Sequence, residues 1–99
     1  MMRKVKLSDV VLDYLDALTD YMVDELKISE EAALKGVGRI KDFLASLSFS
    51  ADYALCRFKK WRELGYRCAV FEKSWVFAYE IFDEGVIIRD MSHATMLIE

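Results

Sequence analysis

The chain of 99 residues contains no proline, a single histidine and only two cysteines. Without proline, only glycine and polar turn residues can interrupt its helices and strands. A structural zinc site takes about four His or Cys ligands, which this sequence cannot readily supply. Cys56 and Cys68 also lack the C-x-x-C spacing of metal and redox motifs, so we expect two reduced, structural thiols and neither metal nor cofactor.

The sequence has no long apolar run either. No stretch reaches the roughly 18 apolar residues that a membrane-spanning helix requires, and the charged start at residues 1–4 is not followed by the apolar part of a signal peptide. We therefore expect a cytoplasmic protein with no membrane partner. Apolar residues make up 55% of the chain, which is enough for one core and hence one domain over residues 1–99.

The net charge of −3 averages over two segments of opposite sign. Residues 8–31 hold eight acidic residues and one lysine, which gives −7. Residues 57–67 hold five basic residues and one glutamate, which gives +4. The acidic segment disfavours general binding to nucleic acid, and the basic segment is the natural place to look for an acidic partner.

Apolar and acidic residues recur at helical spacing in the first half of the chain. The periodicity predicts an amphipathic helix over residues 9–27, capped by Ser8 or Asp9. Ser29 can cap a second helix, whose apolar stripe reaches Leu47. Two helices joined by so short a connection should form an antiparallel hairpin.

The period changes to two in the second half. It predicts strands at 66–72, 75–82 and 86–91, joined by a tight turn at Lys73–Ser74 and by a loop in which Gly85 suits a positive φ. Such short loops imply an antiparallel meander. With a further strand at 3–7, the fold class is α+β, a strand and a helix hairpin packed on a meander. Residues 48–56 are expected to be irregular, and 57–65 fit a loop, a helical turn or an edge strand.

The predicted sheet is apolar on both faces. The face shared by Trp75, Phe77 and Tyr79 can pack on the helices, whereas Val76 and Ala78 point the other way. We expect the neighbouring strands to add apolar side chains to this second face, among them Ala69, Phe71 and Ile87, together with Arg89. A solvated face would be more polar, so either residues 94–99 or a partner chain should cover it.

The order of these elements resembles the RelE/ParE superfamily of toxins from bacterial type II toxin–antitoxin systems. VKLSDVVLDYLDALTDYMVDEL (residues 5–26) is similar to the family's first strand and helix, and SEEAALKGVGRIKDFLASL (29–47) to its second helix. LGYRCAVFEKSWVFAYEI (64–81) resembles the Gly-Tyr-Arg stretch and the two hairpin strands. GVIIRDMSHA (85–94) resembles the final strand.

The resemblance implies a growth inhibitor neutralised by a small cognate antitoxin. ParE-like members poison DNA gyrase by binding it, whereas RelE-like members cut mRNA on the ribosome without a metal. Degenerate, non-toxic members also occur. The antitoxin is expected to lie as an extended or helical segment across the apolar surface of the hairpin or sheet. A homodimer and a toxin–antitoxin hetero-oligomer are both compatible with the resemblance.

The resemblance also indicates candidate catalytic residues. RNA cleavage without metal needs cations to stabilise the phosphorane and an acid to protonate the leaving oxygen. Arg67, Arg89 and His93 occupy the matching positions, but Ala69 and Val76 stand where a nuclease favours further cations. Each candidate has an ordinary alternative. Arg67 and Arg89 can form salt bridges, the latter with Glu80 or Asp90, and His93 can be a hydrogen-bonding histidine at a strand end. The depleted cationic set favours the branch that binds a target protein.

The basic segment is the candidate target-binding surface, formed by Arg57, Lys59, Lys60, Trp61 and Arg62. Cations interleaved with aromatic rings suit an acidic protein surface, and they also suit the phosphates and bases of a nucleic acid. The third interpretation is a solvated loop whose aromatic residues anchor it to the core.

Overall fold

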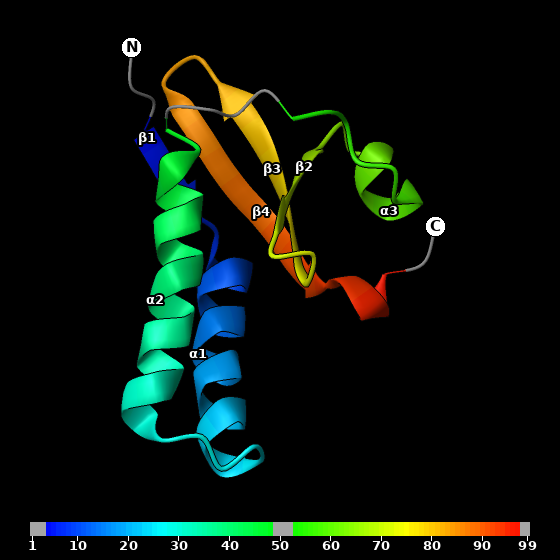
Figure 1. Cartoon of the computed structure of the whole chain (residues 1–99). Helices are drawn as coiled ribbons and strands as arrows, with labels where there is room; N and C mark the ends of the chain where they lie inside the picture. The colour runs from blue at the N-terminus through cyan, green and yellow to red at the C-terminus, as the bar shows by residue number, and fades with distance from the viewer. Residues whose placement is uncertain (1–3, 49–52, 98–99) are drawn as a thin grey trace.

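The computed structural model describes residues 4–48 and 53–97, in one sheet and several helices (Figure 1). The elements are, in order, β1 (Lys4–Leu7), α1 (Asp9–Asp24), α2 (Glu30–Ser46), α3 (Lys59–Arg62), β2 (Arg67–Phe71), β3 (Trp75–Phe82), β4 (Gly85–His93) and the 3-10 turn η1 (Ala94–Met96). The predicted α+β class, the helix hairpin and the meander are confirmed. Two parts of the predictions lie outside the described residues. They are residues 49–52 of the segment predicted to be irregular and Arg3 of the first predicted strand.

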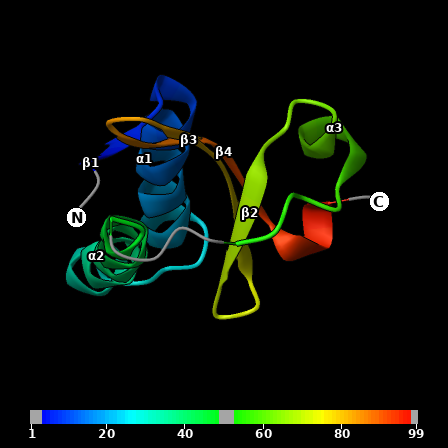
Figure 2. The same ribbon diagram turned by 90° about the horizontal axis from the view of Figure 1, so that it is seen from above.

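The four strands lie in the order β1-β4-β3-β2. β2, β3 and β4 form the antiparallel meander, and β1 joins its edge by pairing in parallel with β4. Figures 1 and 2 show α1 and α2 together on one face of the sheet, with α3 and η1 on the other side. The two sides carry different apolar clusters, and each cluster positions a different candidate surface.

Serine residues cap both long helices, as the sequence predicts. The hydroxyl oxygen of Ser8 accepts a hydrogen bond from the backbone N–H of Val11, and that of Ser29 accepts one from the backbone N–H of Ala32. The first helix ends at Asp24, however, and not at the predicted residue 27. There the backbone N–H of Ile28 donates to the carbonyl of Met22 at 2.9 Å, and Lys27 takes a positive φ of 56°. This C-terminal capping hydrogen bond ends the helix before the apolar periodicity of the sequence ends.

The main core lies between the helix hairpin and the sheet. The innermost side chains on the hairpin are Val11 and Leu15 of α1 and Ile40 and Leu44 of α2. They pack on the sheet face that carries the following buried residues: Ala69, Phe77, Tyr79, Val86, Ile88 and Met91. The apolar residues selected by the helical period of three to four and by the strand period of two therefore pack together in one layer.

The prediction that Ala69 and Phe71 belong to the second face is wrong. Phe71 pairs directly with Trp75 and Ala69 with Phe77, so both side chains face the helices. The reason is the length of the loop, which holds the three residues Glu72–Ser74 and not the two predicted at Lys73–Ser74, so that Phe71 and not Glu72 pairs with Trp75. A shift of one residue in a hairpin moves every side chain of the strand to the opposite face.

The turn between β2 and β3 holds two residues without glycine in the left-handed region. Glu72 has a φ of 53° and Lys73 a φ of 63°, the pattern of a type I′ turn. We expect Lys73→Gly to raise the free energy of unfolding by about 1 kcal/mol, because it relieves the Cβ clash of a left-handed residue. Urea unfolding measures this change. Lys73→Ala is the control, since it removes the charge and keeps the Cβ; an equal gain in the control would contradict the explanation.

Gly85 has a different role from the one predicted. The φ of Gly85 is not positive, and the side of its Cα that would carry a side chain faces β1. A Cβ at this position would lie 2.1 Å from the carbonyl oxygen of Lys4. Glycine is therefore required by the close approach of β1 to the start of β4, where Lys4 pairs with Gly85.

The pairing of β3 with β4 is interrupted by a β-bulge. Ala78 pairs with Asp90 but Tyr79 pairs with Ile88, which leaves Arg89 as the extra residue. The hydroxyl of Ser8 donates to the carbonyl of Arg89 at 3.0 Å, and the N–H of Ser8 donates to that of Ile88 at 3.0 Å. The cap of α1 is thus tied to the bulge of β4.

A second, smaller cluster covers part of the second sheet face. Val76 and Ala78 are buried there beneath Cys56, Phe58 and Trp61. The predicted cover by the C-terminal segment is present in part, because Ala94 and Leu97 pack against the same cluster. The rest of this face stays open near the β3–β4 turn, where Phe82 is 42% exposed.

The expectation of two reduced thiols is wrong, because Cys56 and Cys68 form a disulfide. Residues 54–56 run antiparallel to the start of β2. The N–H of Cys56 donates to the carbonyl of Tyr66, that of Cys68 donates to the carbonyl of Ala54, and Leu55 forms a bridge with Arg67. This pairing places the two cysteines opposite each other, a proximity that their spacing in the sequence does not reveal.

Candidate functional site

Arg67 is the first of the three candidate catalytic residues. It begins β2 opposite Tyr79, on the face that carries the helices. Its guanidinium donates through Nη1 to the backbone carbonyl of Tyr53, and the side chain is half-buried. The contact attaches Arg67 to the segment that leads into the disulfide. The predicted alternative to a catalytic role was a salt bridge, and the observed partner is instead a backbone carbonyl.

Arg89 lies on the opposite face of the sheet. Its Nε is 2.9 Å from Oε1 of Glu80, which confirms one of the two predicted ion pairs. The guanidinium also lies over the ring of Phe82, at 5.7 Å from its centroid. Both neighbours belong to the second face, so this cation points away from Arg67.

His93 ends β4 and caps the 3-10 turn. Its Nδ1 accepts the backbone N–H of Thr95 at 3.3 Å and lies 2.8 Å from the Thr95 hydroxyl. The imidazole also packs edge-on against Trp75, with ring centroids 5.0 Å apart. A hydrogen-bonding histidine at a strand end, the alternative predicted for it, is what the contacts describe.

The structure does not bring these three side chains together. Arg67 and His93 pair with Tyr79 and Trp75 of β3, which are four positions and therefore about 13 Å apart along the strand. They also lie on opposite edges of that strand, because β2 and β4 flank β3. Arg89 is on the other face. A reacting phosphate in contact with one of these groups would lie far from the other two.

The basic segment forms a cap over the second sheet face. We use "basic cap" for residues 57–62, which include the single-turn helix α3. Phe58 and Trp61 point into the small cluster, and Trp61 donates through Nε1 to Oδ2 of Asp90 at 3.2 Å. Trp61 is 2% exposed, so it serves as the predicted core anchor and offers no ring surface to a partner.

The cations of the basic cap lie outside. Arg57, Lys59, Lys60 and Arg62 are all exposed. Lys59 is 4.0 Å from Glu63, and the ammonium of Lys60 lies 4.7 Å from the Trp61 ring centroid. The two aromatic anchors thus hold a patch of four cations on one turn backed by the small cluster, an arrangement that can present charge to an acidic surface.

A groove beside α1 carries apolar side chains. It has a volume of about 600 Å³ and lies between the C-terminal half of α1 and the ends of β3 and β4. Its walls include Tyr14, Leu18, Tyr21, Met22, Leu26, Trp75, His93 and Met96. Tyr21 and Leu26 are about half exposed and Met96 is 73% exposed, an unusual amount of large apolar surface for one cleft.

The groove has an acidic border. Asp24 and Glu25 are exposed at the C-terminal end of α1, close in the sequence to the groove residues Tyr21, Met22 and Leu26. A ligand that fills the groove should therefore combine an apolar stripe with neutral or basic flanks. The sequence predicted apolar and acidic faces on this helix but placed no cleft here, because the opposite wall comes from the distant ends of β3 and β4.

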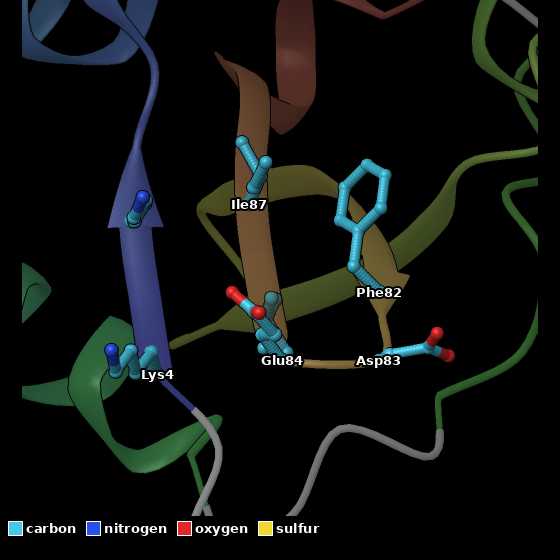
Figure 3. A pocket seen from close by; sticks show the side chains of 8 residues that line it. Lys4, Phe82, Asp83, Glu84 and Ile87 are labelled. Carbon is cyan, nitrogen blue, oxygen red and sulfur yellow. The ribbon is translucent and has the colours of Figure 1, made fainter.

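A further pocket opens where β1 meets the β3–β4 turn (Figure 3). It has a volume of about 420 Å³ and is bordered by Lys4 and Lys6 of β1, by Phe82 and by Ile87. Asp83 and Glu84 contribute two negative charges against the two lysines, so the pocket has no net preference for anions. None of the candidate catalytic residues lines it.

Neither a metal cluster nor a membrane helix is found in the described part of the chain. Residues 4–48 and 53–97 contain no group of three or more His, Cys, Asp or Glu side chains that could hold a metal ion. No helix in the same ranges is long and apolar enough to cross a bilayer.

The arrangement of a strand, a helix hairpin and a meander that takes the first strand in parallel is the ParE-like α+β fold. The chain is similar to a solved chain of the chromosomal ParDE toxin–antitoxin system from P. aeruginosa, with a TM-score of 0.76. The match covers 93% of this chain and 96% of that one, at 21% sequence identity. No family model and no curated protein matches the sequence. At this identity the likeness concerns the fold.

Proposed function

We propose that this chain is the toxin of a type II toxin–antitoxin system and acts in the cytoplasm as a ParE-like growth inhibitor. The observation that carries the proposal is the fold, which matches a ParDE chain over nearly the full length of both. In this proposal the chain binds a target protein and is neutralised by a cognate antitoxin. DNA gyrase is the first candidate target, by resemblance to the ParE branch.

The distribution of cations supports binding over catalysis. A metal-independent nuclease needs its cations and its acid around one phosphate. Here Arg67 binds a backbone carbonyl, Arg89 pairs with Glu80 on the other face, and His93 caps a turn. We therefore place the RelE-like endonuclease second, as the activity to be excluded by experiment.

The basic cap is the surface that we assign to the target. Its four exposed cations have a net charge that complements an acidic protein, and the acidic face of α1 opposes a general affinity for nucleic acid. Phe58 and Trp61 fix the cap to the sheet, so that binding requires little further ordering of the segment.

The apolar groove is the surface that we assign to the antitoxin. An amphipathic helix or an extended segment could bury the exposed sides of Tyr21, Leu26 and Met96 there. The α1 wall of the groove and the basic cap lie on opposite faces of the sheet, whereas η1, which lines the groove through Met96, lies on the side of the cap (Figure 1). Neutralisation by occupation of the groove would therefore act either at a distance or through a longer antitoxin that continues past η1 to the cap.

Induced expression in a bacterial host tests the proposal. We expect growth arrest without cleavage of mRNA, and we expect Lys60→Glu with Arg62→Glu to restore growth to nearly that of uninduced cells. Lys41→Glu on α2 is the matched control, because it reverses an exposed charge away from the cap. Primer extension on cellular mRNA is the second measurement. Cuts at ribosomal A-site positions that vanish in Arg67→Ala would contradict the proposal and identify an endonuclease.

A further inference from the structure

The disulfide closes a loop that contains the whole basic cap. Cys56 and Cys68 are separated by 12 positions, and every cation assigned to the target surface lies between them. Cross-linking two points of a chain stabilises the enclosed segment mainly by limiting its disordered states. The bond therefore acts on the basic cap more directly than on any other part of the molecule.

Few other interactions attach this loop to the sheet. α3 is a single turn of four residues, too short to be stable by itself. At the base of the loop there are two backbone hydrogen bonds, Cys56 N–H to Tyr66 and Cys68 N–H to Ala54. Trp61 adds the hydrogen bond to Asp90, and Phe58 and Trp61 pack in the small cluster, which is separate from the main core between the hairpin and the sheet. The cap can thus open while the main core remains folded.

The two cysteine residues differ in their exposure to solvent. Cys56 is 1% exposed, whereas Cys68 is half-buried on β2. An attacking thiolate would therefore reach Cys68 first. Thiol–disulfide exchange needs such access, and it needs a leaving group that can depart as a thiolate.

We propose that Cys56 and Cys68 form a reversible thiol–disulfide site, which determines whether the basic cap is held against the sheet. In the reducing direction, the thiolate of a small-molecule thiol attacks Sγ of Cys68 and the Cys56 thiolate leaves. A second thiol then attacks the mixed disulfide, which releases Cys68 and a low-molecular-weight disulfide. Two electrons and two protons pass to the protein, and the reverse exchange with that disulfide closes the loop again.

Hydrogen exchange measured by mass spectrometry tests this site in the intact chain. We expect the amides of residues 57–66 to exchange about a hundredfold faster after reduction with dithiothreitol, as loop closure of this size implies. Peptides from α1 and α2 should exchange at unchanged rates. The variant with Cys56→Ala and Cys68→Ala is the matched control, and its cap should exchange quickly with or without dithiothreitol.

Alkylation of free thiols provides the second measurement. After incubation with graded ratios of reduced and oxidised glutathione, we expect the wild-type disulfide to open and close reversibly. A disulfide that persists in a large excess of reduced glutathione would overturn the proposal, as would a cap that exchanges equally in both states. The meaning assigned to opening rests on the proposed function, but neither measurement does. Failure of the growth assay would leave the redox site intact, and failure here would leave growth inhibition intact.

Discussion

Replacement of Trp61 by alanine is expected to lower the free energy of unfolding by about 3–5 kcal/mol, the range for deleting a large buried aromatic side chain. Trp61 is 2% exposed and lies at the centre of the small cluster with Phe58, Val76 and Ala78. Its removal also leaves Asp90 without the indole N–H that donates to it. Urea unfolding followed by circular dichroism measures the change.

Trp61→Phe is the matched control for this variant. It keeps most of the buried ring and loses only the hydrogen bond to Asp90, so we expect a smaller loss of about 1–2 kcal/mol. If both variants unfold at the wild-type urea concentration, the small cluster contributes nothing to stability. In that case the basic cap is held by the disulfide and the backbone hydrogen bonds at its base.

The second large effect concerns the apolar groove. We expect Tyr21→Asp with Leu26→Asp to weaken binding of the antitoxin by about thirtyfold or more, the effect of losing an interface hot spot. Both side chains are about half exposed in the groove, and the new carboxylates would add to its acidic border. Titration calorimetry with the antitoxin encoded beside the gene measures the affinity, and co-expression shows whether growth is still rescued.

Leu34→Asp is the control for the groove. Leu34 is 55% exposed on α2, so the same change is made at a similar exposure but outside the lining of the groove. Affinity should stay within about twofold of wild type, as for a surface residue outside the contact area. An equal loss in both variants would point to a general charge effect, and no loss in either would exclude the groove as the antitoxin site.

Local signals in the sequence predicted the elements well. The serine caps and the helical periodicity define α1 and α2, and the bounds of β3 agree residue for residue with the predicted strand. Each of these signals depends on neighbours within a few positions. The end of α1 was misplaced because the closure by Lys27 and Ile28 leaves no glycine in the sequence to mark it.

Interactions between distant segments could not be predicted in the same way. The face of Ala69 depends on a loop that is one residue longer than predicted, and the disulfide depends on residues 54–56 folding back on β2. The candidate site shows the same division. The ion pair of Arg89 with Glu80 follows from the strands that were predicted, whereas the apolar groove joins α1 to the far ends of β3 and β4.

The pairing of β1 with β4 has a consequence for how the chain folds during synthesis. Ser8, next to β1, bonds to a residue 81 positions later, so the edge of the sheet can be completed only after β4 has been translated. The helix hairpin depends on local contacts and should form earlier. Until the sheet has formed, the apolar stripe of the helix hairpin is exposed to solvent. We therefore expect correct folding of the nascent chain to depend on rapid completion of translation. Pausing of the ribosome before β4 should favour aggregation over folding.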